Sequence, residues 1–309
     1  MFHSLWCLGA QRKGMGIYMF WQQLINGISV GSIYALLAVG YALIYSLLNF
    51  TNFAHAITVT IAAFGCFWFQ FLVSQSLPIG LLAGILSAII TGIFIELLAY
   101  RPLLIKKARR LYLMIVGLGV SILCENLMII IFTGRVRVYP VNFADISVNI
   151  FGTSTGLIDV IILVVSLLAL LCVELYIERT RTGLAIRSSA FNLEATALMG
   201  VNTNRLILTV FIIAGLLAGV AGVLLGAKYT TYTSLGTYMT NKAFIAAVVG
   251  GLGSLPGAVL GALLLGVAES FVSAYISTAF RDLFAYCILI VILLIRPSGL
   301  MGKADGDKA

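Results

Sequence analysis

Long apolar runs, separated by short polar segments, extend along the chain from residue 21 to residue 295. A helix needs about 20 residues to cross a hydrocarbon layer about 30 Å thick, and most of these runs reach that length. Backbone polar groups in lipid must be paired within one helix or around a closed barrel, and the runs are too long for barrel strands. We therefore predict eight membrane-spanning helices, at residues 21–47, 54–73, 79–100, 112–132, 156–177, 205–227, 255–276 and 283–295, the last with a possible earlier start near Thr278.

A ninth apolar stretch, at residues 243–251, is too short to cross the membrane as a regular straight helix. The sequence Gly-Ser-Leu-Pro-Gly follows it from Gly253, so we expect a broken or half-length helix at this point. The expected fold class is all-α: a polytopic transmembrane helical bundle of about eight or nine spans.

The bundle would occupy residues 19–302, with a short segment at 1–18 before it and a tail at 303–309 after it. Residues 1–18 lack a small-residue cleavage site after a clean apolar core, so they do not resemble a signal peptide. Met15 and Met19 both stand just before the first long run, and either is a candidate for the true start.

The composition supports a chain that faces lipid. Of 309 residues, 61% are hydrophobic and 10% are charged, whereas a soluble domain has roughly 45–50% and about 25%. The net charge of +8 comes from basic residues in loops between apolar runs, so membrane topology explains it better than a nucleic-acid partner. The five cysteines and two histidines show no metal-binding spacing, and we expect neither a metal nor a cofactor.

Basic residues gather in three regions, 101–110, 179–205 and 296–308. Because cytoplasmic loops are enriched in Lys and Arg, we place all three regions in the cytoplasm. The N-terminus then lies outside, although Arg12 and Lys13 disagree, and a cytoplasmic C-terminus requires a ninth crossing after Ala227. The short stretch 243–251 can supply it.

Glycines recur at helical spacing in the later spans. Gly215 and Gly219 are four residues apart, and Gly253, Gly257 and Gly261 form a series of three. Lipid provides no hydrophobic attraction between helices, so small residues that permit close backbone approach favour helix packing. The pattern fits either static packing or the sliding surfaces of a transporter.

Polar residues within the apolar runs are candidates for a solute path, because such groups usually face the protein interior or water. Glu125 and Asn126 lie in the middle of the fourth span, where they serve either a structural hydrogen bond or a substrate or proton path. Two breaks, near residues 51–55 and 240–242, could present helix N-termini to a carboxylate. The candidate path residues are Asn52, His55, Glu125, Asn126, Thr240 and Asn241.

The segment 178–204 is too long for a plain turn between two spans. Its Ala, Leu, Met and Glu residues favour a short helix outside the membrane, which Asn192 could cap and Gly200 could end. Glu194 would lie in the first turn, where the helix dipole favours an anion. Such a helix is exposed either to a partner or to the lipid surface.

The residues of this segment match a known family. Glu194-Ala195 followed by Gly200 resembles the coupling motif of ABC importer permeases, whose cytoplasmic helix docks on an ATPase subunit. Several other stretches between residues 21 and 302 resemble the LivH-type permease of branched-chain amino acid importers. They are Asn26-Gly27, Gly31-Ser32-Ile33-Tyr34-Ala35-Leu36, Gly40-Tyr41, Asn52-Phe53-Ala54-His55, Gly250-Gly251-Leu-Gly253-Ser254-Leu-Pro256-Gly257-Ala258 and Arg296-Pro297-Ser298-Gly299-Leu300.

The resemblance implies a permease subunit in a bacterial inner membrane that moves branched-chain amino acids, or a related solute such as urea or an amide. It also implies four kinds of partner: a LivM-type permease, two ATPase subunits, a periplasmic binding protein and the lipid bilayer. Coupling to the ATPase would fall to Glu194, Ala195 and Gly200, with Arg187 in support. The chain has no Gly-x-x-x-x-Gly-Lys-Ser/Thr loop and no catalytic constellation, so we expect no enzymatic activity of its own. An ion-coupled secondary transporter or channel, using Glu125 or Glu269, is the alternative.

Overall fold

The computed structural model describes residues 2–73, 76–140, 147–150 and 153–302, and of these it describes 2–17, 77, 147–150 and 153–154 by backbone alone. The expected tail 303–309 and part of the loop after the fourth span lie outside the described residues. The elements, in chain order, are α1 (Phe2–Leu48), α2 (His55–Leu72), α3 (Leu77–Phe94), the π-helical η1 (Ile95–Tyr100), α4 (Arg101–Ile105), α5 (Arg110–Phe132), β1 (Ser147–Ile150), β2 (Thr153–Gly156), α6 (Leu157–Arg179), α7 (Arg181–Phe191), α8 (Leu193–Leu198), α9 (Thr203–Lys228), α10 (Leu235–Gly250), α11 (Leu255–Tyr275), the 3-10 turn η2 (Thr278–Phe280) and α12 (Arg281–Ile295).

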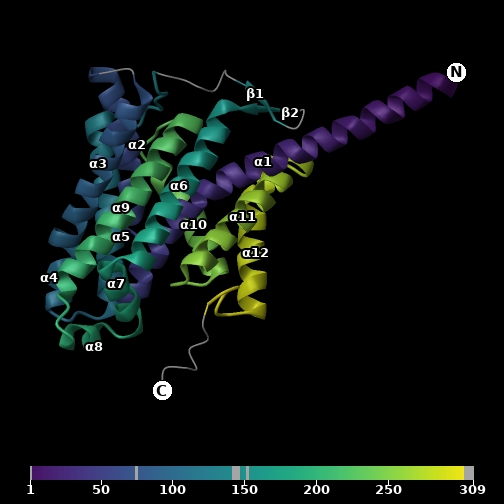
Figure 1. The fold of residues 1–309 in the computed structure, drawn as a ribbon. Coiled ribbons are helices and arrows are strands. Elements are labelled where there is room, and N and C mark those ends of the chain that lie inside the picture. Colours follow the sequence, from purple (N-terminus) through teal and green to yellow (C-terminus); the bar gives the residue numbers. More distant parts are fainter. Residues whose placement is uncertain (1, 74–75, 141–146, 151–152, 303–309) are drawn as a thin grey trace.

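The helices form an elongated bundle in which long helices run between two opposite ends (Figure 1). Within the described residues, eight helical stretches are long and apolar enough to span a membrane, which confirms the all-α transmembrane fold. They are Tyr18–Leu48, His55–Leu72, Pro78–Ile105, Arg110–Phe132, Leu157–Arg179, Thr203–Lys228, Leu255–Tyr275 and Thr278–Ile295. The last begins at Thr278, the earlier of the two starts considered, because η2 continues into α12.

Helix α10 is longer than the sequence predicts. It begins at Leu235 and ends at Gly250, whereas the apolar pattern indicates residues 243–251. The pattern misses the first half because that half carries polar residues, including Asn241 and Lys242, whose environment depends on neighbouring helices. With its 16 residues it is shorter than the roughly 20 that a regular span needs.

The chain nevertheless passes from one end of the bundle to the other between α9 and α11. Lys228, at the end of α9, bonds to Asn26 in the first half of the α1 span. Gly253, just after α10, lies beside Ser46 near the end of α1. Segment 229–234 and α10 therefore make a further passage along the bundle, besides the eight spans of the described residues.

Helices α1 and α9 form the centre, and the outer helices pack on them through glycines. In α9, a Cβ atom on Gly219 would lie 2.8 Å from the Cα of Ile85 in α3, and one on Gly215 would lie 3.1 Å from the carbonyl oxygen of Ala88. Such close approach supplies the dispersion contacts that hold helices together in lipid. The α1–α11 contact is built in the same way, since a Cβ on Gly27 would lie 2.8 Å from the Cα of Val267.

The three glycines predicted to form one packing series in the seventh span have two different roles. Gly257 and Gly261 in α11 lie against the Gly250 end of α10. Gly253 precedes α11, in the turn after α10, and has a φ of +88°. That left-handed conformation favours glycine over residues with a Cβ. Gly253 therefore does not belong to the predicted series of helix-packing glycines, because α11 starts only at Leu255.

The two ends of the bundle carry different small elements. Strands β1 and β2 form an antiparallel hairpin, with Ser147 opposite Gly156, within the segment that the sequence indicates as the largest loop. It lies at the end from which α1 extends, while α7, α8 and the end of α12 lie at the opposite end (Figure 1). The start of α1 and the end of α12 therefore lie on opposite sides of the bundle.

Candidate functional site

A short two-helix segment, α7 and α8, joins α6 to α9 outside the bundle (Figure 1). The Thr180 hydroxyl oxygen accepts a hydrogen bond from the amide of Gly183 (2.9 Å), and the Asn192 side-chain oxygen accepts one from the amide of Ala195 (2.9 Å). The expected cap at Asn192 is confirmed, but it begins the second of two helices because the chain is extended at that residue. Gly200 ends the segment with a φ of +87°.

The residues expected to couple to an ATPase are all on the surface of this segment. Glu194 and Ala195 are exposed on α8, and Gly200 has open space around the position of a side chain. Arg187 is on α7, where its guanidinium donates to the carbonyl oxygen of Glu178 over 3.4 Å. The structure thus groups three of the four on α8 and its end, with the fourth on the preceding helix.

Two exposed apolar side chains at the tip of the segment were not singled out from the sequence. Leu198 is 89% exposed and Met199 is 85% exposed, among the most exposed apolar side chains described. They follow Glu194 by four and five residues and stand next to Gly200. An apolar tip between polar residues is typical of a surface that a partner covers.

The break between α1 and α2 buries its polar residues. The Asn52 side-chain oxygen accepts hydrogen bonds from the amide of Ala54 (3.0 Å) and from the hydroxyl of Tyr100 (2.7 Å). His55 begins α2, is 2% exposed and packs edge-on against the ring of Tyr41. These two candidate path residues lie in the packed interior of the single chain.

The remaining candidates lie on α5 and α10 and differ in burial. A Glu125 carboxylate oxygen accepts a hydrogen bond from the hydroxyl of Thr237 in α10 (3.0 Å), which brings α5 to α10. Asn241, one turn further along α10, is exposed, whereas Thr240 is fully buried. Asn126 is exposed, and its amide donates to the carbonyl oxygen of Ile122 in its own helix.

A cluster of ionised side chains joins α10, α11 and α12. The ammonium nitrogen of Lys242 lies 3.0 Å from a carboxylate oxygen of Glu269 and 2.8 Å from one of Asp282. Arg281 lies 3.8 Å from the other oxygen of Glu269, which also accepts a hydrogen bond from Tyr34 in α1 (3.0 Å). The two cations and two anions give the cluster a formal charge of zero.

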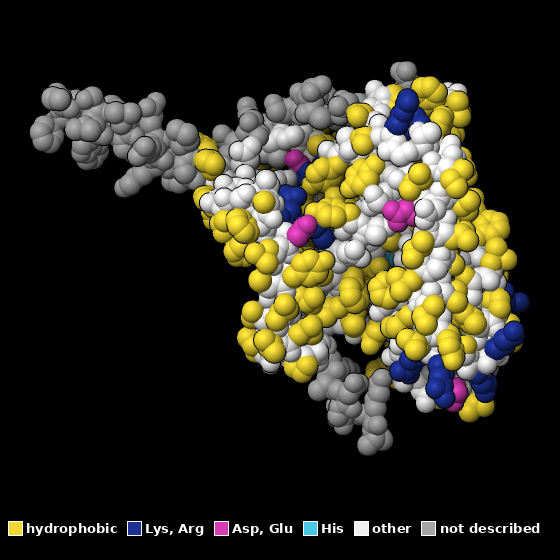
Figure 2. Space-filling view, turned by 180° about the vertical axis from the view of Figure 1, so that it is seen from behind, with side chains coloured by type: hydrophobic (Ala, Val, Ile, Leu, Met, Phe, Trp, Pro, Cys, Tyr) yellow, Lys and Arg dark blue, Asp and Glu magenta, His cyan; other side chains and the backbone are white. Residues whose placement is uncertain are grey.

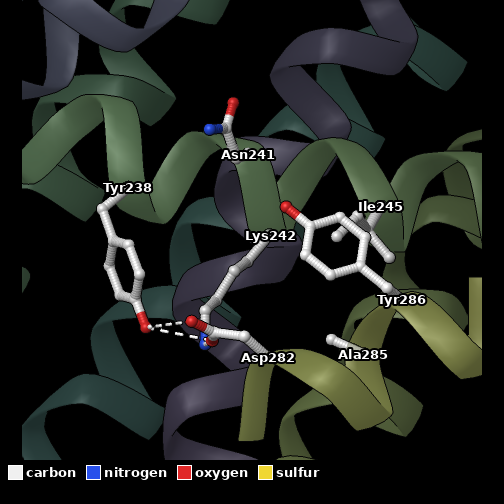
Figure 3. Close-up of a pocket in the computed structure, with 7 residues that line it drawn as sticks. All are labelled: Tyr238, Asn241, Lys242, Ile245, Asp282, Ala285 and Tyr286. Carbon is white, nitrogen blue, oxygen red and sulfur yellow. Dashed lines mark hydrogen bonds and ion pairs between the residues drawn. The ribbon is translucent and has the colours of Figure 1, made fainter.

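This cluster opens to the outside of the chain through a small cleft, which we call the charged cleft. Figure 3 shows its lining: Tyr238, Asn241, Lys242, Ile245, Asp282, Ala285 and Tyr286. In Figure 2, acidic and basic side chains are visible among hydrophobic ones in the upper half of this face, away from its edges. Charged groups at such a depth are costly in lipid, so they usually pair or face water or protein.

The sequence indicates only some of the residues of this cleft. It identified Asn241 and the break at 240–242, and it noted Glu269 as an ionisable residue within a span. It gave no role to Asp282, because the last span was predicted to begin at residue 283. The sequence does carry a signal, since Lys242, Glu269 and the Arg281-Asp282 pair are charged residues within otherwise apolar stretches.

Most of the chain matches one known protein family. Residues 23–293 match the family described as the branched-chain amino acid transport system permease component. The chain belongs to this family. It is therefore a membrane permease component, with the α7–α8 segment and the charged cleft as parts of such a protein.

Individual relatives cover nearly the whole chain. The high-affinity branched-chain amino acid transport system permease protein BraD of Pseudomonas aeruginosa is 37% identical over 305 residues, which cover 94% of this chain and 99% of BraD. LivH of Escherichia coli K12, a protein of the same description, is 37% identical over 303 residues, covering 94% and 97%. The galactofuranose transporter permease YtfT of E. coli K12 is 28% identical, covering 70% and 64%.

Proposed function

We propose that this protein is the membrane-spanning subunit of an ABC importer that moves branched-chain amino acids across a bacterial inner membrane. The observation that carries the proposal is the 37% identity to BraD over 94% of this chain and 99% of that one. The charged side chains of the cleft sum to zero net charge, which is compatible with a solute that carries one positive and one negative charge. The chain conducts the solute and makes or breaks no bond in it.

The proposed partners are a LivM-type second permease, two ATPase subunits and a periplasmic binding protein. The end that carries α7 and α8 would face the cytoplasm, together with the C-terminus, and the N-terminus would lie in the periplasm. Support comes from the basic residues at that end, among them Arg101, Lys106 and Arg181, because cytoplasmic loops are enriched in Lys and Arg.

Coupling would run through α8. When the ATPase subunits close on ATP, their surfaces press on the tip formed by Leu198 and Met199, with Glu194 beside it. Since α7 is continuous with α6 through the short turn at Thr180, and α8 leads into α9, a push on the tip moves two membrane-spanning helices together. The movement of these helices opens and closes the path of the solute.

Reconstitution of the full transporter in liposomes tests the function. We expect uptake of leucine, isoleucine and valine that requires ATP on the cytoplasmic side and the binding protein on the other. Uptake should persist when ion gradients are collapsed by ionophores. Uptake by this chain alone that follows an ion gradient and ignores ATP would contradict the proposal and support an ion-coupled carrier.

A further inference from the structure

The two ion pairs of Lys242 differ in burial. Glu269 is 2% exposed, and Tyr34 and Arg281 hold its second oxygen, so this pair is enclosed on all sides by protein. The Asp282 side chain is 49% exposed, and it also accepts a hydrogen bond from the hydroxyl of Tyr238, at 3.1 Å. The Lys242–Glu269 pair is thus built into the bundle, whereas the Lys242–Asp282 pair stands at the opening of the charged cleft.

We propose that the Lys242–Asp282 pair is the site that takes the zwitterionic head of the amino acid during passage. This inference rests on the proposed function and names the residues that contact the solute. The carboxylate of the solute replaces Asp282 at Lys242, and its ammonium group replaces Lys242 at Asp282. One ion pair becomes two, the net charge of the cleft stays at zero, and no proton is transferred.

Glu269 makes this exchange possible. When Asp282 leaves Lys242, the buried ammonium would lose its compensation in a low-dielectric environment, which is costly. Glu269 stays at 3.0 Å from Lys242 and keeps that charge paired. The hydroxyl of Tyr34 also stays on Glu269.

Helix α12 can provide the opening that the exchange needs. A zwitterion fits between Lys242 and Asp282 only if the 2.8 Å pair separates, and Asp282 stands in the first turn of α12. Only 6% of the 18 residues of this span are buried, against 94% of an 18-residue stretch of the first span. A helix with so little buried surface moves at low cost in packing, and Asp282 moves with it.

The rest of the cleft suits an aliphatic side chain. Ile245 and Ala285 supply apolar surface beside the pair, and the rings of Tyr238 and Tyr286 flank it, as Figure 3 shows. A sugar or urea carries no charges to exchange with an ion pair, so this cleft favours an α-amino acid over either. The transported class is therefore a zwitterion with an apolar side chain.

The first experiment compares two ion pairs in the complete reconstituted transporter. Asp282→Asn removes the exchangeable charge, and the control Asp159→Asn removes the partner of Lys228, 2.6 Å away and outside the cleft. The measured quantity is leucine imported per ATP hydrolysed in the presence of leucine-loaded binding protein. We expect Asp282→Asn to lower this ratio by about tenfold or more, the value of a charge-assisted contact, and Asp159→Asn to change it by less than about twofold.

A second comparison uses exposed residues, which leaves folding intact. Asn241→Trp fills the mouth of the cleft, and Leu294→Trp places the same ring on an 80% exposed position of α12 away from it. We expect the first to block leucine uptake with assembly retained, and the second to leave uptake unchanged.

An unchanged ratio in Asp282→Asn, equal losses in Asp282→Asn and Asp159→Asn, or normal uptake by Asn241→Trp would each overturn the inference while the proposed function stands. Absence of leucine uptake by the wild-type transporter would overturn both.

Discussion

The ammonium nitrogen of Lys242 lies 2.8 Å from a carboxylate oxygen of Asp282, and this contact ties α10 to the outermost helix, α12. Lys242 is 5% exposed while Asp282 is 49% exposed, so one half of the pair belongs to the interior and the other to the surface. The contact links α10, most of whose residues are buried, to a helix with little buried surface.

Glu269→Gln is expected to destabilise the protein strongly. Removal of one partner from a buried ion pair leaves an uncompensated charge and costs about 3–5 kcal/mol, and Glu269 is 2% exposed beside Lys242. Thermal unfolding in mild detergent measures the effect. Glu174→Gln, at an exposed acidic residue in α6, is the control and should leave the midpoint almost unchanged. Equal midpoints for the two variants would show that the Glu269 pair adds nothing to stability.

Gly219→Leu should disrupt the packing of α9 on α3. A Cβ atom there would lie 2.8 Å from the Cα of Ile85, so the helices must separate, at a cost of about 1–3 kcal/mol from overpacking. Gly119→Leu in α5 is the control, because nothing lies within 4 Å of a Cβ at that position. The measurement is the yield of monodisperse protein and its unfolding midpoint. A loss at Gly119 as large as at Gly219 would argue against this account.

Leu198→Asp should uncouple the permease from its ATPase. The side chain is 89% exposed, so the substitution costs little folding energy, but it places a charge in the apolar tip of α8. We expect normal insertion, weak co-purification of the ATPase subunits and a loss of uptake of about tenfold or more, the scale of an interface hot spot. Leu198→Met keeps the apolar surface and should retain uptake. Full transport by the aspartate variant would remove α8 from the coupling pathway.

Glu125→Gln separates a hydrogen-bonding role from a charge-carrying one. A glutamine carbonyl still accepts the hydrogen bond that Thr237 donates to Glu125 at 3.0 Å. In an ATP-driven permease we expect uptake within about twofold of the wild type, because the hydrogen bond is kept and no charge at this position drives transport. Glu125→Leu, which removes the acceptor, should reduce stability more. Abolished uptake in the glutamine variant, with the fold intact, would instead indicate that the charge itself is needed for transport.

The α7–α8 segment was largely predictable from the sequence because its signals are local. The side chain of Asn192 caps the helix that begins one residue later, and Gly200 ends it, both within a stretch of about ten residues. The apolar tip was missed, since Leu198 and Met199 look like buried residues by type. Their exposure follows only from the way α7 and α8 turn away from the bundle.

The spans were predictable for a simple physical reason: lipid requires each crossing to carry about 20 apolar residues in one continuous piece of chain. The sequence alone therefore determined the eight spans and the all-α class. The first half of α10 and the start of the last span depended on polar residues that become tolerable only next to partners. Lys242, Glu269 and Asp282 are up to 40 residues apart in the sequence. Their meeting in one neutral cleft was decided by the tertiary structure, because only the packing of α10, α11 and α12 brings opposite charges close enough to pair.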